Sequence, residues 1–367
     1  MLIDTRLIPL LFLLIQSSFA AVNISAAPAD RTLSRYVIEN QLPIAVQTHE
    51  VVKVPTTDVV LISQMSNSVL LKARVDDRGA VLELFAFQIQ TNNSGLHGLT
   101  NSQAFPGMVW LTLQRDNMLV LIDPQVDSIQ AAPKVLKEIP VPGATSKGPH
   151  YIGEYGDELW VSLQDSSHVL RINYNNPSIY SIYPGVEHPV FVAQHPINKM
   201  YYTSQDKSSS VMRINPKTGK TKQLKIPAKI GQTPVGMIGG PLGIWFTLLG
   251  TPTQGTGTIG HIGANNKIVY HKLTSPLGKD AALLHLAFDL DATENYTLWL
   301  LSSSIINENA LDMIIKVTFD AQWRNIKSED VLVLPTQKAK AHRLLLTPTN
   351  VFATELATSK LLSFYNL

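Results

Sequence analysis

Cysteine is absent from all 367 residues of the chain. This excludes disulfide bonds, thiolate nucleophiles and cysteine-ligated zinc sites. A folded chain without such cross-links has to draw its stability from the burial of apolar surface in a large core. The composition permits this, because 45% of the residues are hydrophobic and 7% are aromatic, which also argues against a disordered chain.

Charge is scarce as well, since only 16% of the residues are charged and the formal net charge is +2. So small a net charge produces no strong electrostatic field that would attract nucleic acid or an anionic membrane. We therefore expect no nucleic-acid partner. Segment 207–229 is a local exception, with seven basic residues and no acidic one. We interpret this run as a solvated face in preference to a contact for an anionic partner.

Long apolar runs are missing beyond the first 20 residues, and a membrane-spanning helix needs about 20 consecutive apolar residues. Residues 1–20 contain one arginine, an apolar run over 7–15 and then Ser18-Phe-Ala20, which places small residues before a cleavage site. This pattern predicts a secretory signal peptide over 1–20, an N-terminal segment over 21–33 and an extracellular protein with no membrane span. In a eukaryotic host, Asn23, Asn92 and Asn295 would be N-glycosylation acceptors.

Sustained helical periodicity is also lacking, and strand-length apolar runs recur in its place. The stretch Gly148–Leu163 is one unit of a repeat in which an aromatic or apolar residue marks the register. The marks are Val60, Trp110, Trp160, Tyr201, Trp245, Trp299 and Phe352, which are 50, 50, 41, 44, 54 and 53 residues apart. Four-strand repeats of about 40–50 residues are typical of β-propeller blades. The sequence therefore predicts an all-β, seven-bladed propeller over residues 34–367.

The ends of the chain predict how the ring closes. The seventh unit stops at its third strand, at Leu367, whereas Ser34–Glu39 resembles an isolated fourth strand. Pairing of these two segments would complete the last blade and remove an exposed sheet edge, which is a template for aggregation.

Histidine is concentrated in a second recurring position, 10–14 residues before each mark, at the start of each innermost strand. The occupants of this slot are His49, His97, His150, Val190, Val235, His285 and His342. Imidazoles around one mouth of a ring could bind a metal ion or move protons. The alternative is that each histidine is a local cap for a neighbouring blade's backbone.

The motif Gly148-Pro-His-x-Ile, followed by Leu159-Trp-Val-Ser and Val169-x-Arg-Ile, resembles the virginiamycin B lyase or streptogramin lyase family. The resemblance implies a seven-bladed propeller that opens cyclic depsipeptides by elimination, with Mg²⁺ and histidines assisting proton removal. It assigns His342 and Glu355 as catalytic residues, and His285, His342 and Glu355 as metal ligands. His49, His97 and His150 would form a ligand-binding rim at the same mouth.

The site departs from the family pattern, since neither His285 nor His342 follows a proline, Val235 replaces a slot histidine, and a lysine stands in the ligand shell. Lys340 stands where the family has an acidic residue two positions before the last-blade histidine, and a lysine repels a divalent cation and removes an oxygen ligand. Two hypotheses follow: a secreted lyase-like propeller performing metal-assisted elimination on an ester-containing ligand, or a non-catalytic propeller that binds a ligand or a protein. In either case we expect a monomer with a small-molecule or peptide-like ligand at the mouth.

Overall fold

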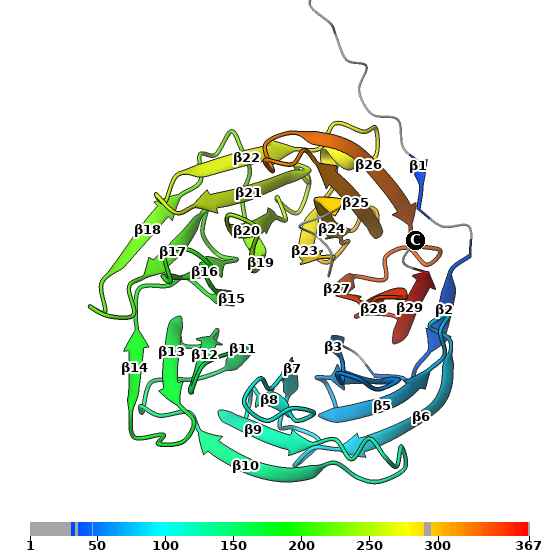
Figure 1. Ribbon diagram of the computed structural model, residues 1–367, viewed down its shortest axis with the longest axis vertical. Helices are drawn as coiled ribbons and strands as arrows, with labels where there is room; N and C mark the ends of the chain where they lie inside the picture. The colour runs from blue at the N-terminus through cyan, green and yellow to red at the C-terminus, as the bar shows by residue number, and fades with distance from the viewer. Residues whose placement is uncertain (1–30, 34–35, 46, 290–294, 366–367) are drawn as a thin grey trace, which may run out of the picture.

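The computed structural model describes residues 31–33, 36–45, 47–289 and 295–365, which form seven sheets arranged radially around one axis (Figure 1). Six sheets have four strands and one has five. The prediction of an all-β, seven-bladed propeller is confirmed. In this part of the chain the helical residues are the 3-10 turn over Gly278–Asp280 and the single residue Asn295, and no helix there is long and apolar enough to cross a membrane.

In six blades the four strands follow one another outward from the axis in chain order, and in the seventh the outermost strand comes from the N-terminal region, so that one strand of every blade lines the centre (Figure 1). The innermost strands are β3 (Thr48–Lys53), β7 (Leu96–Asn101), β11 (Pro149–Tyr155), β15 (Pro189–Gln194), β19 (Pro234–Gly240), β23 (Leu283–Phe288) and β27 (Ala341–Leu346). The second strands are β4 (Val59–Gln64), β8 (Val109–Leu113), β12 (Glu158–Leu163), β16 (Tyr201–Gln205), β20 (Gly243–Leu248), β24 (Thr297–Ser302) and β28 (Asn350–Glu355).

The outer half of each blade is built in the same way. The third strands are β5 (Val69–Val75), β9 (Met118–Asp123), β13 (His168–Asn173), β17 (Ser210–Ile214), β21 (Thr258–Gly263), β25 (Met313–Phe319) and β29 (Lys360–Tyr365). The outermost strands are β6 (Val81–Gln88), β10 (Lys134–Pro140), β14 (Tyr180–Tyr183), β18 (Thr221–Lys225), β22 (Ile268–Lys272), β26 (Ile326–Val333) and β2 (Ile38–Gln41). A short strand β1 (Arg31–Thr32) pairs in parallel with β26.

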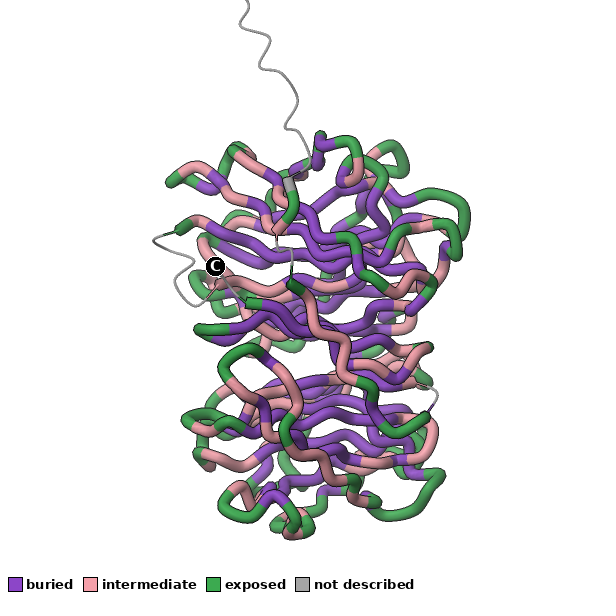
Figure 2. The backbone as a smooth tube through the Cα atoms, turned by 90° about the vertical axis from the view of Figure 1, so that its right-hand side faces the viewer, coloured by how far each residue is buried: buried purple, intermediate pink, exposed green. Residues whose placement is uncertain are grey.

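The core lies between the blades, and Figure 2 shows buried backbone through the middle of the molecule with exposed segments mainly at the loops. The four repeat tryptophans, Trp110, Trp160, Trp245 and Trp299, are at most 1% exposed. Trp160 stacks on Tyr201 of the next blade with ring centroids 3.5 Å apart. These aromatic residues therefore stabilise the ring by packing between neighbouring blades.

A bulge follows the first residue of every innermost strand. In six blades a serine or threonine hydroxyl of the second strand accepts a hydrogen bond from the backbone N–H of the third residue of the innermost strand, at 2.7–3.1 Å. The six donors are Glu50, Gly98, Tyr151, Phe191, Gly236 and Arg343. Five of these hydroxyls also donate to a backbone carbonyl of the next blade, at 2.7–3.1 Å. The accepting residues are His97, His150, Val190, Leu284 and His49.

These hydrogen bonds correct the predicted slot of the sixth blade. Thr247 donates to the carbonyl of Leu284, and Leu283 pairs with Ser302 as Pro149 pairs with Leu163. The slot residue is therefore Leu284, which is the unpaired residue of the bulge, and His285 lies one residue later, where it pairs with Leu301. Because side-chain direction changes at each strand residue, a shift of one position places His285 in a different layer.

The same pairing corrects two of the predicted register marks. The last residue of each second strand pairs with the first residue of the innermost strand, and Trp160 lies three positions before that last residue. The residues at the same position in the first and fourth blades are Leu61 and Tyr202, not Val60 and Tyr201. The error arose because both neighbours in each pair are apolar and buried, so apolar character alone could not fix the register.

Closure of the seventh blade by an N-terminal strand is confirmed. Ile38 pairs with Ser363 and Gln41 with Lys360, so the closing strand is Ile38–Gln41, whereas the prediction placed it at 34–39. Asn40 extends this contact to the first blade, because its side chain donates to Gly79 O and accepts from Val81 N. Ser34, the predicted signal peptide and Asn23 lie outside the described residues; Asn92 and Asn295 are exposed.

We predict that the closing strand carries much of the stability of the ring. Relative to a chain of residues 31–367, a chain starting at Leu42 should melt at a markedly lower temperature, because it exposes the edge of β29 and loses the Asn40 hydrogen bonds. A chain starting at Tyr36 keeps β2 and serves as the control, with a much smaller loss. Equal melting temperatures for the three chains, measured by circular dichroism, would contradict closure by β2.

Candidate functional site

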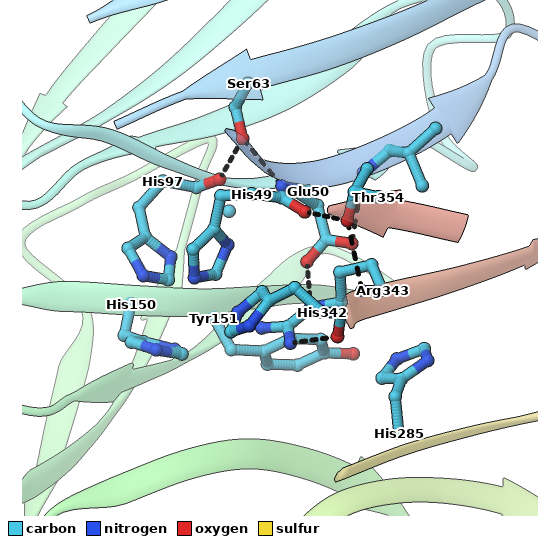
Figure 3. A network of polar contacts seen from close by, with 12 residues as sticks. His49, Glu50, Ser63, His97, His150, Tyr151, His285, His342, Arg343 and Thr354 are labelled. Carbon is cyan, nitrogen blue, oxygen red and sulfur yellow. Dashed lines mark hydrogen bonds and ion pairs between the residues drawn. The ribbon is translucent and has the colours of Figure 1, made fainter. Parts of the chain in front are cut away.

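Four imidazoles pack side by side at one end of the axis, and we call them the histidine arc. They come from the slot positions of four consecutive blades: His342, His49, His97 and His150 (Figure 3). Their ring centroids are 3.9, 3.7 and 3.9 Å apart in that order. The other three slots hold Val190, Val235 and Leu284. The seven slot residues form a ring around the axis, which we call the slot ring. Four adjacent histidines make up its imidazole half, and three adjacent aliphatic residues make up its aliphatic half.

The imidazoles of the arc are buried and electrically neutral near pH 7. Burial lowers the pKa of His342 well below its ordinary value, and the positive charge of Arg343 lowers it further. Burial acts in the same way on His49, His97 and His150, with additional repulsion from the other histidines and Arg343. Within the described chain, Nδ1 of each of the four rings and Nε2 of His342 lack a hydrogen-bond partner. Neutral, unpartnered imidazoles can accept or donate a hydrogen bond or bind a metal.

Arg343 lies next to the arc, near the axis of the ring, and its side chain is 2% exposed. Its Nε donates to Glu50 Oε2 at 2.9 Å, and its guanidinium lies 4.8 Å from the ring centroid of Phe191. Its Nη1 donates to His342 O at 3.1 Å. In the preceding blade Leu301 occupies the position of the bulge hydroxyl, so Arg343 takes over the bond to the slot carbonyl that a serine or threonine makes elsewhere.

Two cavities lie on either side of this charged pair. The cavity on the slot side, which we call the histidine mouth, has a volume of about 440 Å³ and is bordered by His150, His342 and Arg343 on one side. Aliphatic side chains border its other side; these are Val190, Val235, Leu249, Leu284, Ile305 and Ile306. The opposite cavity, of about 820 Å³, contains Glu50, Tyr151, Phe191 and His285 in its lining. There the polar groups are already engaged: Glu50 binds Arg343, and His285 Nδ1 accepts the N–H of Leu344 at 3.2 Å.

Glu355 lies at the end of β28 and belongs to a different cluster. Thr358 Oγ1 donates to its Oε2, and the charges that act on it are those of Glu39 and Lys360. Lys360 Nζ in turn donates to Glu39 Oε2 at 2.6 Å, so this is the cluster that joins β29 to the closing strand. Burial raises the pKa of Glu355 to about 7; the Thr358 hydrogen bond opposes the rise and the charge of Glu39 adds to it.

The structure thus divides the predicted site residues into three groups. His49, His97, His150 and His342 lie together, His285 borders the opposite cavity, and Glu355 lies in the closure cluster. No hydrogen bond among the described residues links Glu355 to His342. Mg²⁺ prefers a shell of oxygen ligands, and His285, His342 and Glu355 do not assemble one. The structure gives no support for Mg²⁺ at these residues.

The loop before His342 is fixed by a buried acid that sequence reasoning missed. Asp312 is fully buried and accepts the backbone N–H groups of Ala339 and Ala341, each at 2.9 Å. Lys340, between them, has a left-handed backbone with φ 53°. Arg343 and Glu50 were missed as well. Their positions in the repeat could be found from sequence, but the ion pair between the first and seventh blades could not.

We predict that Arg343→Met destabilises the fold by about 3 kcal/mol, because it leaves the Glu50 carboxylate, whose side chain is only 12% exposed, without its ion pair. The double variant Glu50→Gln/Arg343→Met should lose less than the single variant, since it removes the uncompensated charge. Arg74→Met is the control, because its ion pairs with Asp58 and Glu83 are partly exposed and should contribute less than about 1 kcal/mol. Urea unfolding measures all three; a double variant at least as destabilised as Arg343→Met would refute the charge argument.

We also predict that Glu355→Gln makes stability less dependent on pH. From its ordinary value of 4.5 up to about 7, Glu355 ionises in the unfolded chain but stays protonated in the folded one, so native stability falls as pH rises through this window. Each pH unit corresponds to about 1.4 kcal/mol. The variant should equal the native protein at pH 4 and exceed its free energy of unfolding by roughly 2–3 kcal/mol at pH 8, less than the about 3.5 kcal/mol of the full shift because solvent screens part of it. Glu187→Gln, at an exposed carboxylate, should show no such gain; a gain equal at both pH values would argue against ionisation as its cause.

Comparison with known proteins shows similarity at the level of fold. No family model and no curated protein matches the chain. Virginiamycin B lyase from Staphylococcus aureus matches with a TM-score of 0.68 and 17% identity, over 90% of this chain and 99% of that chain. A catalytically inactive variant of that lyase with quinupristin gives 0.68 and 16%, over 90% and 100% of the two chains.

A propeller outside the lyases matches almost as well. YCF48 bound to a D1 peptide has a TM-score of 0.63 and 12% identity, over 94% of this chain and 100% of that chain. At sequence identities this low, the structural matches establish a similar fold but do not establish a shared activity. The chain is therefore similar in fold to the streptogramin lyases, as its repeat motif predicted, and to propellers with other roles.

Proposed function

We propose that the protein is a ligand-binding propeller that takes a small amphipathic molecule into the histidine mouth. One observation carries this proposal: the slot ring has a continuous imidazole half and a continuous aliphatic half. A ligand with an apolar face would pack against Val190, Val235 and Leu284. Its polar face would hydrogen-bond to His150 and His342, which border the cavity. Mostly apolar walls with a few convergent polar groups are typical of small-molecule sites.

Size and charge narrow the class of ligand. A volume of about 440 Å³ suits a small molecule or one side chain of a peptide. Two of the three charged residues in the lining are paired, since Arg343 binds Glu50 and Asp206 Oδ1 lies 2.5 Å from His188 Nδ1, and Lys207 is the third. An uncharged ligand that carries a carbonyl or hydroxyl group therefore suits the mouth better than an ionic one. Peptide-like esters and amides have this chemistry.

Elimination on an ester-containing ligand is the second candidate. Two observations favour it: His342 has two unpartnered ring nitrogens beside the cavity, and the pKa of Glu355 is about 7, as a general acid or base requires. The separation of Glu355 from the arc argues for binding without turnover. In a site of this kind His342 would accept the proton, and Lys340 would occupy the place of the family's acidic residue.

We predict that N-acetylphenylalanine methyl ester, a small amphipathic ester, binds at the histidine mouth. Val235→Thr keeps the side-chain shape but places a hydroxyl in the aliphatic half, and should weaken binding several-fold because that hydroxyl has no partner there. Val269→Thr, on the outermost strand of the same blade and 45% exposed, is the matched control. Isothermal titration calorimetry measures the affinities. Equal affinities for the native protein and Val235→Thr, or no binding by the native protein, would contradict the proposal.

Turnover separates the two candidates. Quinupristin would be incubated with the native protein and with Lys340→Glu, each with and without chelator, and ring opening followed by mass spectrometry. No turnover by the native protein supports binding alone. Ring opening by the native protein that chelator abolishes would establish the lyase candidate instead.

A further inference from the structure

Three histidines of the arc bring ring nitrogens close enough together to share one metal ion. Ring nitrogens of His49, His97 and His150 all lie within 4.8 Å of one another, and the three residues are 4, 3 and 6% exposed. An ion about 2.1 Å from each nitrogen needs the nitrogens roughly 3.0–3.5 Å apart. The nitrogens therefore have to approach one another by at most roughly 1.3–1.8 Å, which side-chain rotations can supply.

Each of the three histidines keeps one ring nitrogen without a hydrogen-bond partner in the part of the chain that the structure describes. Nδ1 of His49, of His97 and of His150 is buried without a hydrogen bond, and a buried polar atom without a partner costs about 1–3 kcal/mol. An ion would satisfy these atoms.

The backbone already holds the three histidines in place. The carbonyls of His49, His97 and His150 each accept a hydroxyl hydrogen bond from the preceding blade, at 2.7, 2.7 and 3.0 Å. The donors are Thr354, Ser63 and Thr112. These second-strand residues belong to the packed body of three different blades. Binding therefore does not have to order a loop, and the entropic cost of assembling the ligands is already met by folding.

We propose that His49, His97 and His150 bind one divalent transition-metal ion, with His342 beside them as a fourth nitrogen donor. Its ring centroid lies 3.9 Å from that of His49, and both of its ring nitrogens are unpartnered. Glu50, which follows His49 in the chain, is paired with Arg343, and Asp206, which lines the mouth, lies 2.5 Å from His188 Nδ1. A nitrogen-only ligand set selects Zn²⁺, Co²⁺, Ni²⁺ or Cu²⁺ over Mg²⁺ and Ca²⁺, which require oxygen ligands.

This site goes beyond the ligand-binding function, because it depends on the imidazole half of the mouth alone. An ion at the arc would border the cavity through His150 and His342, where it could accept a carbonyl oxygen of the bound molecule. Ligand binding and metal binding can therefore fail separately. Binding of N-acetylphenylalanine methyl ester by chelator-treated protein would leave the proposed function standing without the metal.

The test uses chelator-stripped protein of residues 31–367 titrated with CoCl₂, ZnCl₂ and MgCl₂. We expect one Co²⁺ or Zn²⁺ per chain by equilibrium dialysis with elemental analysis, a visible Co²⁺ d–d spectrum, and no Mg²⁺ uptake. His97→Asn and His150→Gln should each lower the Zn²⁺ affinity by at least ~100-fold, above the range for loss of an outer-shell partner.

The control is His271→Asn, which removes an equally buried histidine outside the arc and should keep the native affinity. Melting temperatures of the metal-free proteins show whether each variant is folded. Absence of stoichiometric Co²⁺ or Zn²⁺ binding by the native protein would overturn the proposal. So would native affinity in both folded arc variants, or an equal loss of affinity in His271→Asn.

Discussion

The hydrogen bond from a second-strand hydroxyl to the slot carbonyl of the next blade is the contact on which the rest of the site depends. Each such hydroxyl also accepts the N–H of its own bulged innermost strand, so one side chain fixes both the bulge and the next blade. The bulge determines which residue occupies the slot and therefore which side chains meet at the axis. In the sixth blade Leu301 stands in place of this hydroxyl. Arg343 donates to the slot carbonyl of the seventh blade instead, so that carbonyl still has a hydrogen-bond partner.

Arg343 links this backbone pattern to the electrostatics of the mouth. Its charge is balanced by Glu50, yet it still disfavours protonation of the nearby imidazoles beyond the effect of burial. The result is a group of neutral, buried histidines with free nitrogens beside an aliphatic wall. This combination supports both proposals, because an amphipathic ligand needs the contrast between the two halves and a transition metal needs neutral nitrogen donors.

Much of the fold could be predicted because it follows from local repetition. Four-strand repeats carry their own period, and the truncated seventh unit predicted closure from the N-terminus. The errors occurred where neighbouring residues have similar chemistry. Val60 and Leu61 are both aliphatic, and Leu284 and His285 are adjacent candidates for one slot, so a shift of one residue was invisible without the pairing partners. Glu355 was matched by motif, but its neighbours Glu39 and Lys360 are brought together only by ring closure.

The sequence by itself determined the seven blades, the closure of the ring and the enrichment of histidine near the axis, since each is a property of strand-length segments and their spacing. The tertiary structure decided which histidines meet. His49 and His342 are 293 positions apart in the numbering, yet their ring centroids are 3.9 Å apart, because the first and last blades become neighbours only in the closed ring. The division into imidazole and aliphatic halves, and the charged pair between Glu50 and Arg343, likewise exist only after the bulges and the closing strand have set the register.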